Sequence, residues 1–338
     1  MTLNARFTFV VRMLFSVFML GLVTYTVDFG RAWDMLVQLP LWYFFASILY
    51  QFLLLIIIAF RWWIIAPGAS FTRLLEITVR AQFVVFLFPS SITVDAFRLW
   101  SLRSDSAGLV GNTAIIVVDK IAGMVAILIV FGLAGVCAAL PNAMQGLFYL
   151  PVVLSLSFGT LLCAIICFIP MQQIYSSFTN TRLGKMIVTR LSNSVLAYSE
   201  ATFSAIKGTS RKRVSASLAV ALLYQAIMIV GYLLVSIVFD IRLTVSQMLF
   251  VSSLMQVVMF VPLSIAGIGI KDLSLVYLLV QFGVHSDIAY AATLSSYPVS
   301  LALALLGWLT AIVSSNRGPV ISQIDIGVKH NTPRNRDL

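Results

Sequence analysis

The chain has 338 residues, of which 60% are hydrophobic and only 10% are charged. Ordinary soluble domains are about 25% charged, so this composition excludes a soluble globular protein and indicates an integral membrane protein. The formal net charge of +10 is interpreted as a signal of membrane topology rather than of nucleic-acid binding, because Lys and Arg gather on the cytoplasmic side of membrane proteins.

Long uncharged runs predict about six full membrane crossings, since a helix needs about 20 apolar residues to span the hydrocarbon core. The first crossing follows Arg6 and Arg12 and is not followed by a small-residue cleavage site, so it is interpreted as a retained anchor rather than a signal peptide. The crossings are expected near residues 9–27, 42–60, 112–139, 149–169, 215–239 and 288–313.

Two further apolar stretches, 74–101 and 246–284, are interrupted by proline and are expected to form broken or re-entrant helical hairpins. If the hairpins are counted as crossings, the total rises to about eight spans. For the second stretch, two separate spans over 246–265 and 272–284 remain an open alternative.

The distribution of basic residues predicts that both termini lie in the cytoplasm. Lys and Arg are concentrated at the N-terminus, in the loop 171–213 and in the tail 317–338, whereas the connections on the other side are nearly free of them. The loop 171–213 also has apolar residues at helical spacing, which favours an amphipathic helix on an anionic leaflet, and a plain positively charged loop is the alternative.

These elements predict an all-α, polytopic membrane protein made of two inverted repeats. A single membrane domain is expected over 1–316, with repeat 1 at about 1–140 and repeat 2 at about 141–316, followed by a polar cytoplasmic tail. The two halves are expected to be inverted because each half contains an odd number of full crossings.

Residues 88–95 and 261–272 share the pattern Pro-x-Ser-Ile followed by an acidic residue, and they lie in corresponding places of the two halves. A broken membrane helix is tolerated where it lines a cavity, and the helix that restarts after the break presents free N–H groups that suit an anion. An ordinary interfacial turn is the alternative for both. In the second motif the predicted binding residues are Ser264, Gly267, Gly269, Lys271 and Asp272.

Charged residues near the first motif complete the predicted binding site. Asp119 and Lys120 lie inside an otherwise apolar helix, where ionisable groups either face a cavity or reach outward to the interface. Asp95 and Arg98 are one helical turn apart and could pair with each other. Arg61 directly precedes a pair of tryptophans that resemble an interfacial belt. It is either a further charged residue at membrane depth or only an anchor of the helix at the interface.

In order and spacing, these motifs resemble the membrane family shared by the flippase-like region of lysylphosphatidylglycerol synthetases and many small membrane proteins. The resemblance covers essentially the whole chain and is carried by Phe88-Pro89 through Asp95, then Arg98, Leu102-Arg103, Asp119-Lys120 and Pro262 through Asp272. The chain departs from the family pattern at Thr93 and Val94, which replace glycines, and at Ala266, Lys120 and Asp272.

The resemblance implies a flippase or transporter that moves an anionic phospholipid or a polyprenyl-phosphate-linked group across the cytoplasmic membrane of a prokaryote. Arg98, Lys120 and Lys271 would hold a phosphate, while Asp95 and Asp272 would orient those cations or bind a cationic headgroup. The chain resembles the stand-alone membrane module, so an accessory subunit for a separately encoded transferase is one alternative.

A lipid-modifying transferase is the other alternative, although the only histidines are His285 and His330 and no catalytic motif is present. Cys137, Cys163 and Cys167 lie in apolar runs without a zinc ligand set. No catalytic residue, metal, cofactor or nucleic-acid partner is therefore predicted.

Overall fold

The structure is a computed structural model, and it describes residues 29–66, 68–87, 91–102, 108–168, 210–260 and 270–315. All regular secondary structure in these ranges is α-helical, which confirms the predicted all-α fold. The helices are α2 (Phe29–Val37), α3 (Leu41–Ile65), α4 (Phe71–Leu87), α5 (Ser91–Ser101), α6 (Gly108–Cys137), α7 (Asn142–Phe168), α11 (Arg211–Phe239), α12 (Val245–Phe260), α13 (Ile270–Gln281), α14 (Ser286–Leu294) and α15 (Ser296–Ser315).

Five described segments are long and apolar enough to cross a membrane, and each coincides with a predicted crossing. They are Leu41–Ile65, Val110–Cys137, Asn142–Ile165, Arg211–Phe239 and Ser286–Val313. The first predicted crossing, the loop 171–213 up to residue 209 and the tail lie outside the described residues. Many large apolar side chains of these segments are exposed, as a lipid-facing surface requires.

The two predicted hairpins correspond to α4 followed by α5 and to α12 followed by α13. All four helices are shorter than the membrane-capable segments, and the helices of each pair contact each other. The Pro-Ser turns between them, 88–90 and 261–269, lie outside the described residues. Their re-entrant character therefore stays a prediction.

The contacts between helices follow a two-fold pattern, in which α3, α4, α5 and α6 correspond to α11, α12, α13 and the joined α14 and α15. The contact of α3 with α4 matches that of α11 with α12, and the contact of α4 with α15 matches that of α12 with α6. Likewise, α5 contacts α6 as α13 contacts α14. Two structurally related halves produce such a pattern, whereas the repeat boundaries and the inversion stay predictions.

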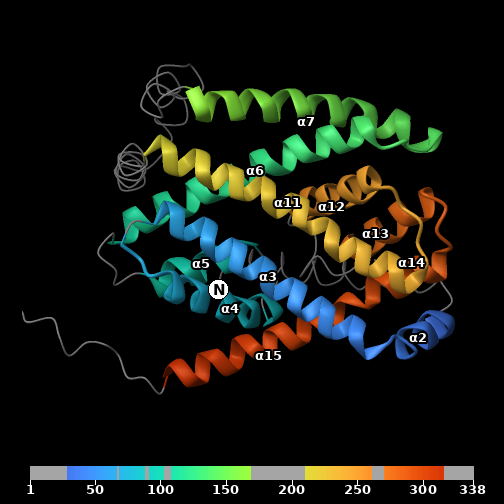
Figure 1. Ribbon diagram of the computed structural model, residues 1–338, viewed down its shortest axis with the longest axis horizontal. Coiled ribbons are helices and arrows are strands. Elements are labelled where there is room, and N and C mark those ends of the chain that lie inside the picture. Colours follow the sequence, from blue (N-terminus) through green and yellow to red (C-terminus); the bar gives the residue numbers. More distant parts are fainter. Residues whose placement is uncertain are drawn as a thin grey trace, which may run out of the picture.

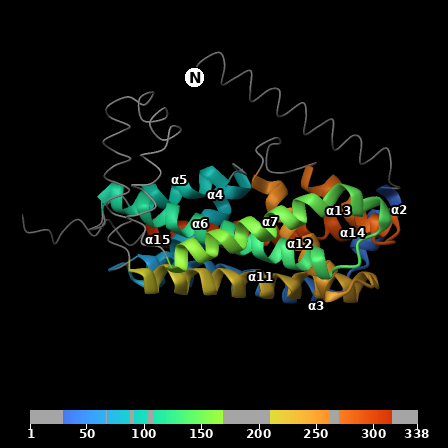
Figure 2. The ribbon, with the colours of Figure 1, turned by 90° about the horizontal axis from the view of Figure 1, so that it is seen from above.

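The two corresponding helices α3 and α11 also pack directly against each other. Figure 2 shows these two helices together along one side of the bundle. Gly231 allows this approach, since a Cβ atom there would lie 2.7 Å from the ring of Tyr50.

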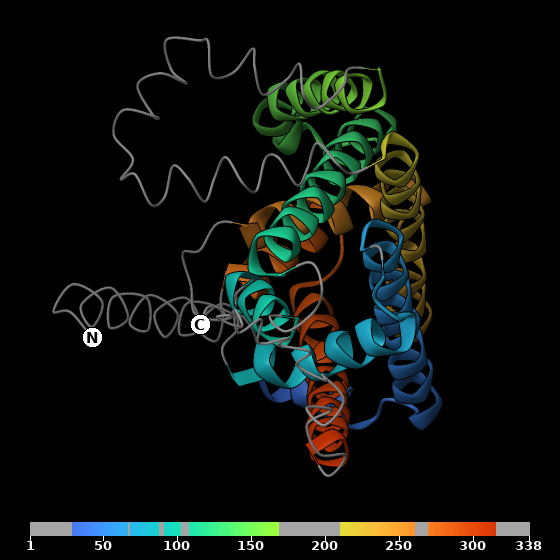
Figure 3. The same cartoon turned by 90° about the vertical axis from the view of Figure 1, so that its left-hand side faces the viewer.

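The edges of the bundle are formed by α7 and α15, which lie at opposite sides in Figures 1 and 3. Small residues let α7 pack closely on α6, as a Cβ atom at Gly132 would clash with Leu156. Phe250 of α12 belongs to one apolar core cluster, where its ring stacks on Phe131 of α6 at 5.2 Å and meets Phe148 of α7 edge-on at 5.6 Å.

Candidate functional site

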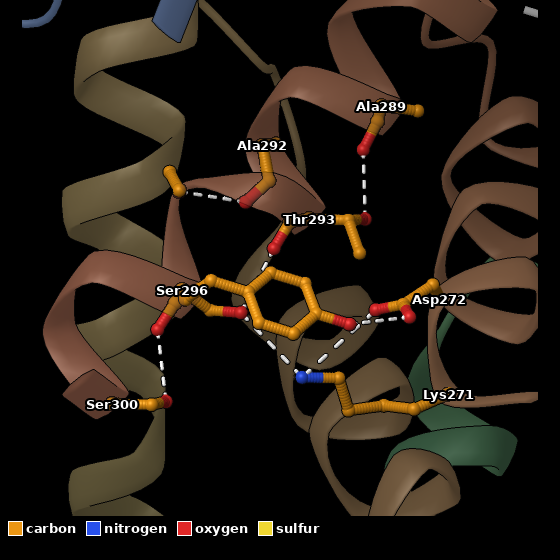
Figure 4. A network of polar contacts seen from close by, with 9 residues as sticks. Lys271, Asp272, Ala289, Ala292, Thr293, Ser296 and Ser300 are labelled. Atoms are coloured by element: carbon orange, nitrogen blue, oxygen red, sulfur yellow. Dashed lines mark hydrogen bonds and ion pairs between the residues drawn. The ribbon is translucent and has the colours of Figure 1, made fainter. Parts of the chain in front are cut away.

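The residues after the second Pro-Ser turn form a polar network with the junction between α14 and α15 (Figure 4). Asp272 is only 2% exposed and accepts a hydrogen bond of 2.6 Å from the hydroxyl of Tyr297. The Nζ atom of Lys271 lies 3.5 Å from the hydroxyl of Ser296, 4.0 Å from Asp272 Oδ1 and 5.1 Å from the ring centroid of Tyr297. Both charged residues of the motif therefore point to α15.

The local sequence explains why the last crossing breaks at this point. Pro298 lies in the first turn of α15, where its missing N–H removes no internal hydrogen bond, so a new helix can start there. The hydroxyls of Thr293, Ser295 and Ser296 donate to carbonyls of the preceding turn. Ser296 lies well inside the apolar segment Ser286–Val313, so Lys271 brings a cation beside the interior of a membrane-capable segment.

A cavity of about 210 Å³ opens in front of Lys271. Its polar wall includes Tyr43, Ser47, Tyr50 and Gln51 of α3 together with Thr293, Ser295 and Ser296. Most of the other lining residues are apolar, and they come mainly from α11 and α13. The hydroxyls of Tyr43 and Ser295 are hydrogen-bonded at 2.7 Å, which ties α3 to the junction of α14 and α15.

A second hollow of about 440 Å³ lies on the other side of the same junction and is almost entirely apolar. It is lined by Trp33, Leu36, Phe86, Leu294, Tyr297, Pro298 and Leu301. Along the junction, residues 293, 295, 296 and 299 line the cavity at Lys271, whereas residues 294, 297, 298 and 301 line this apolar groove. One short segment thus separates a partly polar space from an almost entirely apolar one.

The charged residues around the first motif form a different group, which lies between α3, α5 and α6. The guanidinium of Arg61 donates two hydrogen bonds to the carboxylate of Asp119, at 2.6 and 2.8 Å. Gly123 leaves room for this arrangement, because a Cβ there would lie 3.4 Å from Arg61 Nη1. Lys120 pairs with Asp95 at 3.0 Å. We call Arg61, Asp95, Arg98, Asp119 and Lys120 the charge cluster.

Arg98 is the most enclosed cation of this cluster, at 9% exposure. Its guanidinium carbon lies 5.0 Å from the ring of Trp62, and it interacts electrostatically with Asp119 and Asp95. The interpretation of Arg61 as an interfacial anchor is wrong, because Arg61 pairs with Asp119 inside the protein. The expected pairing of Asp95 with Arg98 alone is also incomplete, since Asp95 forms its ion pair with Lys120.

The predicted site residues therefore separate into two groups. Lys271 lines the cavity and Asp272 lies buried beside it, hydrogen-bonded to Tyr297, whereas Asp95, Arg98, Asp119 and Lys120 belong to the charge cluster. Ser264, Gly267 and Gly269 lie outside the described residues. The sequence did not predict that Tyr297 and Ser296 contact the charged residues of this site, because both lie within an apolar run. No cluster of described residues could hold a metal ion.

The described part of the chain is thus a bundle of membrane-capable helices that contains a partly polar cavity and a buried charge cluster, which defines a multi-pass membrane protein. A family model described as the lysylphosphatidylglycerol synthase TM region matches residues 9–311. The chain therefore belongs to this family, which confirms the resemblance found in its motifs. Comparisons with curated proteins and with solved structures found no match.

Proposed function

We propose that this protein moves an anionic lipid, either a phospholipid or a polyprenyl-phosphate-linked group, across the cytoplasmic membrane of a prokaryote. The observation that carries the proposal is the junction of α14 and α15, which has on one side a partly polar cavity containing Lys271 and several hydroxyls, and on the other the apolar groove. An amphiphile has the same division into a polar and an apolar part. Membership of the lysylphosphatidylglycerol synthase TM region family supports a role in lipid chemistry or lipid movement.

Lys271 is the residue that would bind the anionic headgroup. Its side chain is 31% exposed and lines the cavity together with serine, threonine and tyrosine hydroxyls. Its contacts with Asp272 and Ser296, at 4.0 and 3.5 Å, are long for hydrogen bonds of an ammonium group. A phosphate entering the cavity can therefore compete for the ammonium group, while Asp272 remains hydrogen-bonded to Tyr297.

The apolar groove would hold one hydrocarbon chain of the same lipid. Its volume of about 440 Å³ falls within the range of roughly 300–1,000 Å³ that ligand pockets occupy. The aromatic ring of Tyr297 forms part of its wall while the hydroxyl of the same residue holds Asp272. The headgroup and the chain would consequently lie on the two sides of one residue.

Transport by the full-length protein in vesicles tests the proposal. Vesicles would carry fluorescent phosphatidylglycerol or a fluorescent polyprenyl phosphate, and the rate at which label becomes accessible to an external quencher would be measured. Lys271→Ala is expected to slow translocation at least about tenfold, the effect of losing about 1.4 kcal/mol of binding. Arg242→Ala is the matched control, because Arg242 is an exposed cation in the connection between α11 and α12.

Filling the groove gives a second, independent arm of the same experiment. Leu301→Trp is expected to slow the movement of long-chain lipids more than that of short-chain analogues, whereas Leu305→Trp on the lipid-exposed face of α15 should change neither. The proposal is wrong if wild-type protein moves no tested lipid faster than protein-free vesicles do, or if Lys271→Ala transports at the wild-type rate.

A further inference from the structure

The charge cluster contains one more cation than it has carboxylates. Its cations are Arg61, Arg98 and Lys120, and its carboxylates are Asp95 and Asp119. The adjacent pair on α4, Arg80 with Glu76, is neutral.

The unmatched charge belongs to Arg98. Both oxygens of Asp119 accept from Arg61, and Asp95 pairs with Lys120 through Oδ2. Arg98 Nε is buried and has no hydrogen-bond partner among the described residues. A buried cation without its own counter-ion costs several kcal/mol in a low-dielectric interior, so an external anion at this position would stabilise the protein.

The surroundings of Arg98 fit a phosphate group. Its planar guanidinium can donate two parallel hydrogen bonds to phosphate oxygens, and the ring of Trp62 at 5.0 Å supports that plane. The indole Nε1 of Trp62 is likewise buried without an acceptor among the described residues. Arg98 itself is 9% exposed, and its neighbours Lys120 and Asp95 are partly exposed, with side chains that are 35% and 22% accessible.

We propose that Arg98, supported by Trp62 and flanked by Lys120, forms a second anion site that binds one phosphate group, separate from the cavity at Lys271. The phosphate is either that of a lipid headgroup or free inorganic phosphate, because the guanidinium recognises the same oxygens in both. This site does not depend on lipid transport, since it follows from the charge balance and burial of the cluster alone.

Binding measurements on the full-length Lys271→Ala protein isolate this second site from the first. The protein would be purified in detergent without phosphate, and binding of radiolabelled inorganic phosphate and of short-chain phosphatidylglycerol would be measured by equilibrium dialysis. We expect about one bound ligand per chain, and an affinity at least about tenfold lower when Arg98→Gln is added. Arg73→Gln, which removes an exposed cation of α4, should leave the affinity unchanged.

Two further variants keep the test decisive if Arg98→Gln fails to fold. Arg98→Lys retains the charge but loses the two-pronged geometry, so it should bind several-fold more weakly. Trp62→Phe retains a ring under residue 98 but should abolish any tryptophan fluorescence change that phosphate causes in the parent. Binding of inorganic phosphate assigns a free-phosphate site, and binding of the lipid alone assigns a headgroup site.

The inference is overturned if the Lys271→Ala protein binds neither ligand, or if it binds equally well with Gln or Lys at position 98. Failure of the transport proposal gives a different result. In that case the wild-type protein moves no lipid, but Arg98→Gln still weakens phosphate binding.

Discussion

The charge cluster includes Asp95 of α5 and the Lys271 cavity adjoins Asp272 of α13, the acidic residues of the two Pro-Ser motifs, yet the two regions satisfy their charges in different ways. In the cluster, each carboxylate is paired with a cation at 2.6–3.0 Å. At the cavity, Asp272 is held by the neutral hydroxyl of Tyr297, and Lys271 stands 4.0 Å from the carboxylate. The ion pairs of the cluster hold the helices together. At the cavity the carboxylate of Asp272 is bound by a hydroxyl, so the ammonium group of Lys271 stays available to a ligand.

The comparison predicts that the largest loss of stability comes from breaking the pair of Arg61 and Asp119. Asp119→Asn leaves a buried guanidinium without its counter-charge, and we expect the free energy of unfolding to fall by about 3–5 kcal/mol. Chemical unfolding in detergent would measure this change. Asp34→Asn, which neutralises an exposed carboxylate on α2, should have almost no effect.

The double variant Arg61→Met with Asp119→Leu distinguishes the contribution of the ion pair to stability from that of burying side chains at these two positions. Apolar side chains of similar size avoid the desolvation cost, so this variant should regain most of the lost stability. An unchanged unfolding midpoint in Asp119→Asn would show that the cluster does not hold α3 on α6, and the contrast between the two regions would fail.

How far the sequence predicted this arrangement depends on the range of each interaction. The apolar runs predicted the five described membrane-capable segments, because hydrophobic length is a local property. The partner of Asp119 was not predictable, since Arg61 lies 58 positions away on another helix. The role of Tyr297 was likewise not predictable. A tyrosine inside an apolar run does not indicate which carboxylate its hydroxyl will bind.

A smaller effect is expected from Tyr297→Phe in the second half. This change removes the hydrogen bond to the buried Asp272, and a hydrogen bond to a charged group contributes about 1.5–3 kcal/mol. The matched control is Tyr277→Phe, because Tyr277 is exposed on α13. Equal unfolding free energies for the two variants would contradict the assigned role of the hydroxyl.

Asp95→Asn should have a still smaller effect on stability, about 0.2–1 kcal/mol, because the pair with Lys120 is partly exposed to solvent. The same variant raises the excess positive charge of the cluster, so phosphate binding in the Lys271→Ala background should become several-fold tighter. Weaker binding would mean that Asp95 takes part in holding the ligand rather than in balancing the cations.

The change in stability expected for Lys271→Ala is also small, although this variant should have the largest effect on transport. Lys271 is partly exposed and its polar contacts are long, so removing it leaves Asp272 still bound to Tyr297 and should alter the free energy of unfolding by less than about 1 kcal/mol. Unfolding and vesicle transport would be measured on the same preparation. A residue whose role is to bind a ligand is expected to contribute little to stability in the absence of that ligand. A loss of stability as large as that of Asp119→Asn would therefore show that Lys271 has a structural role.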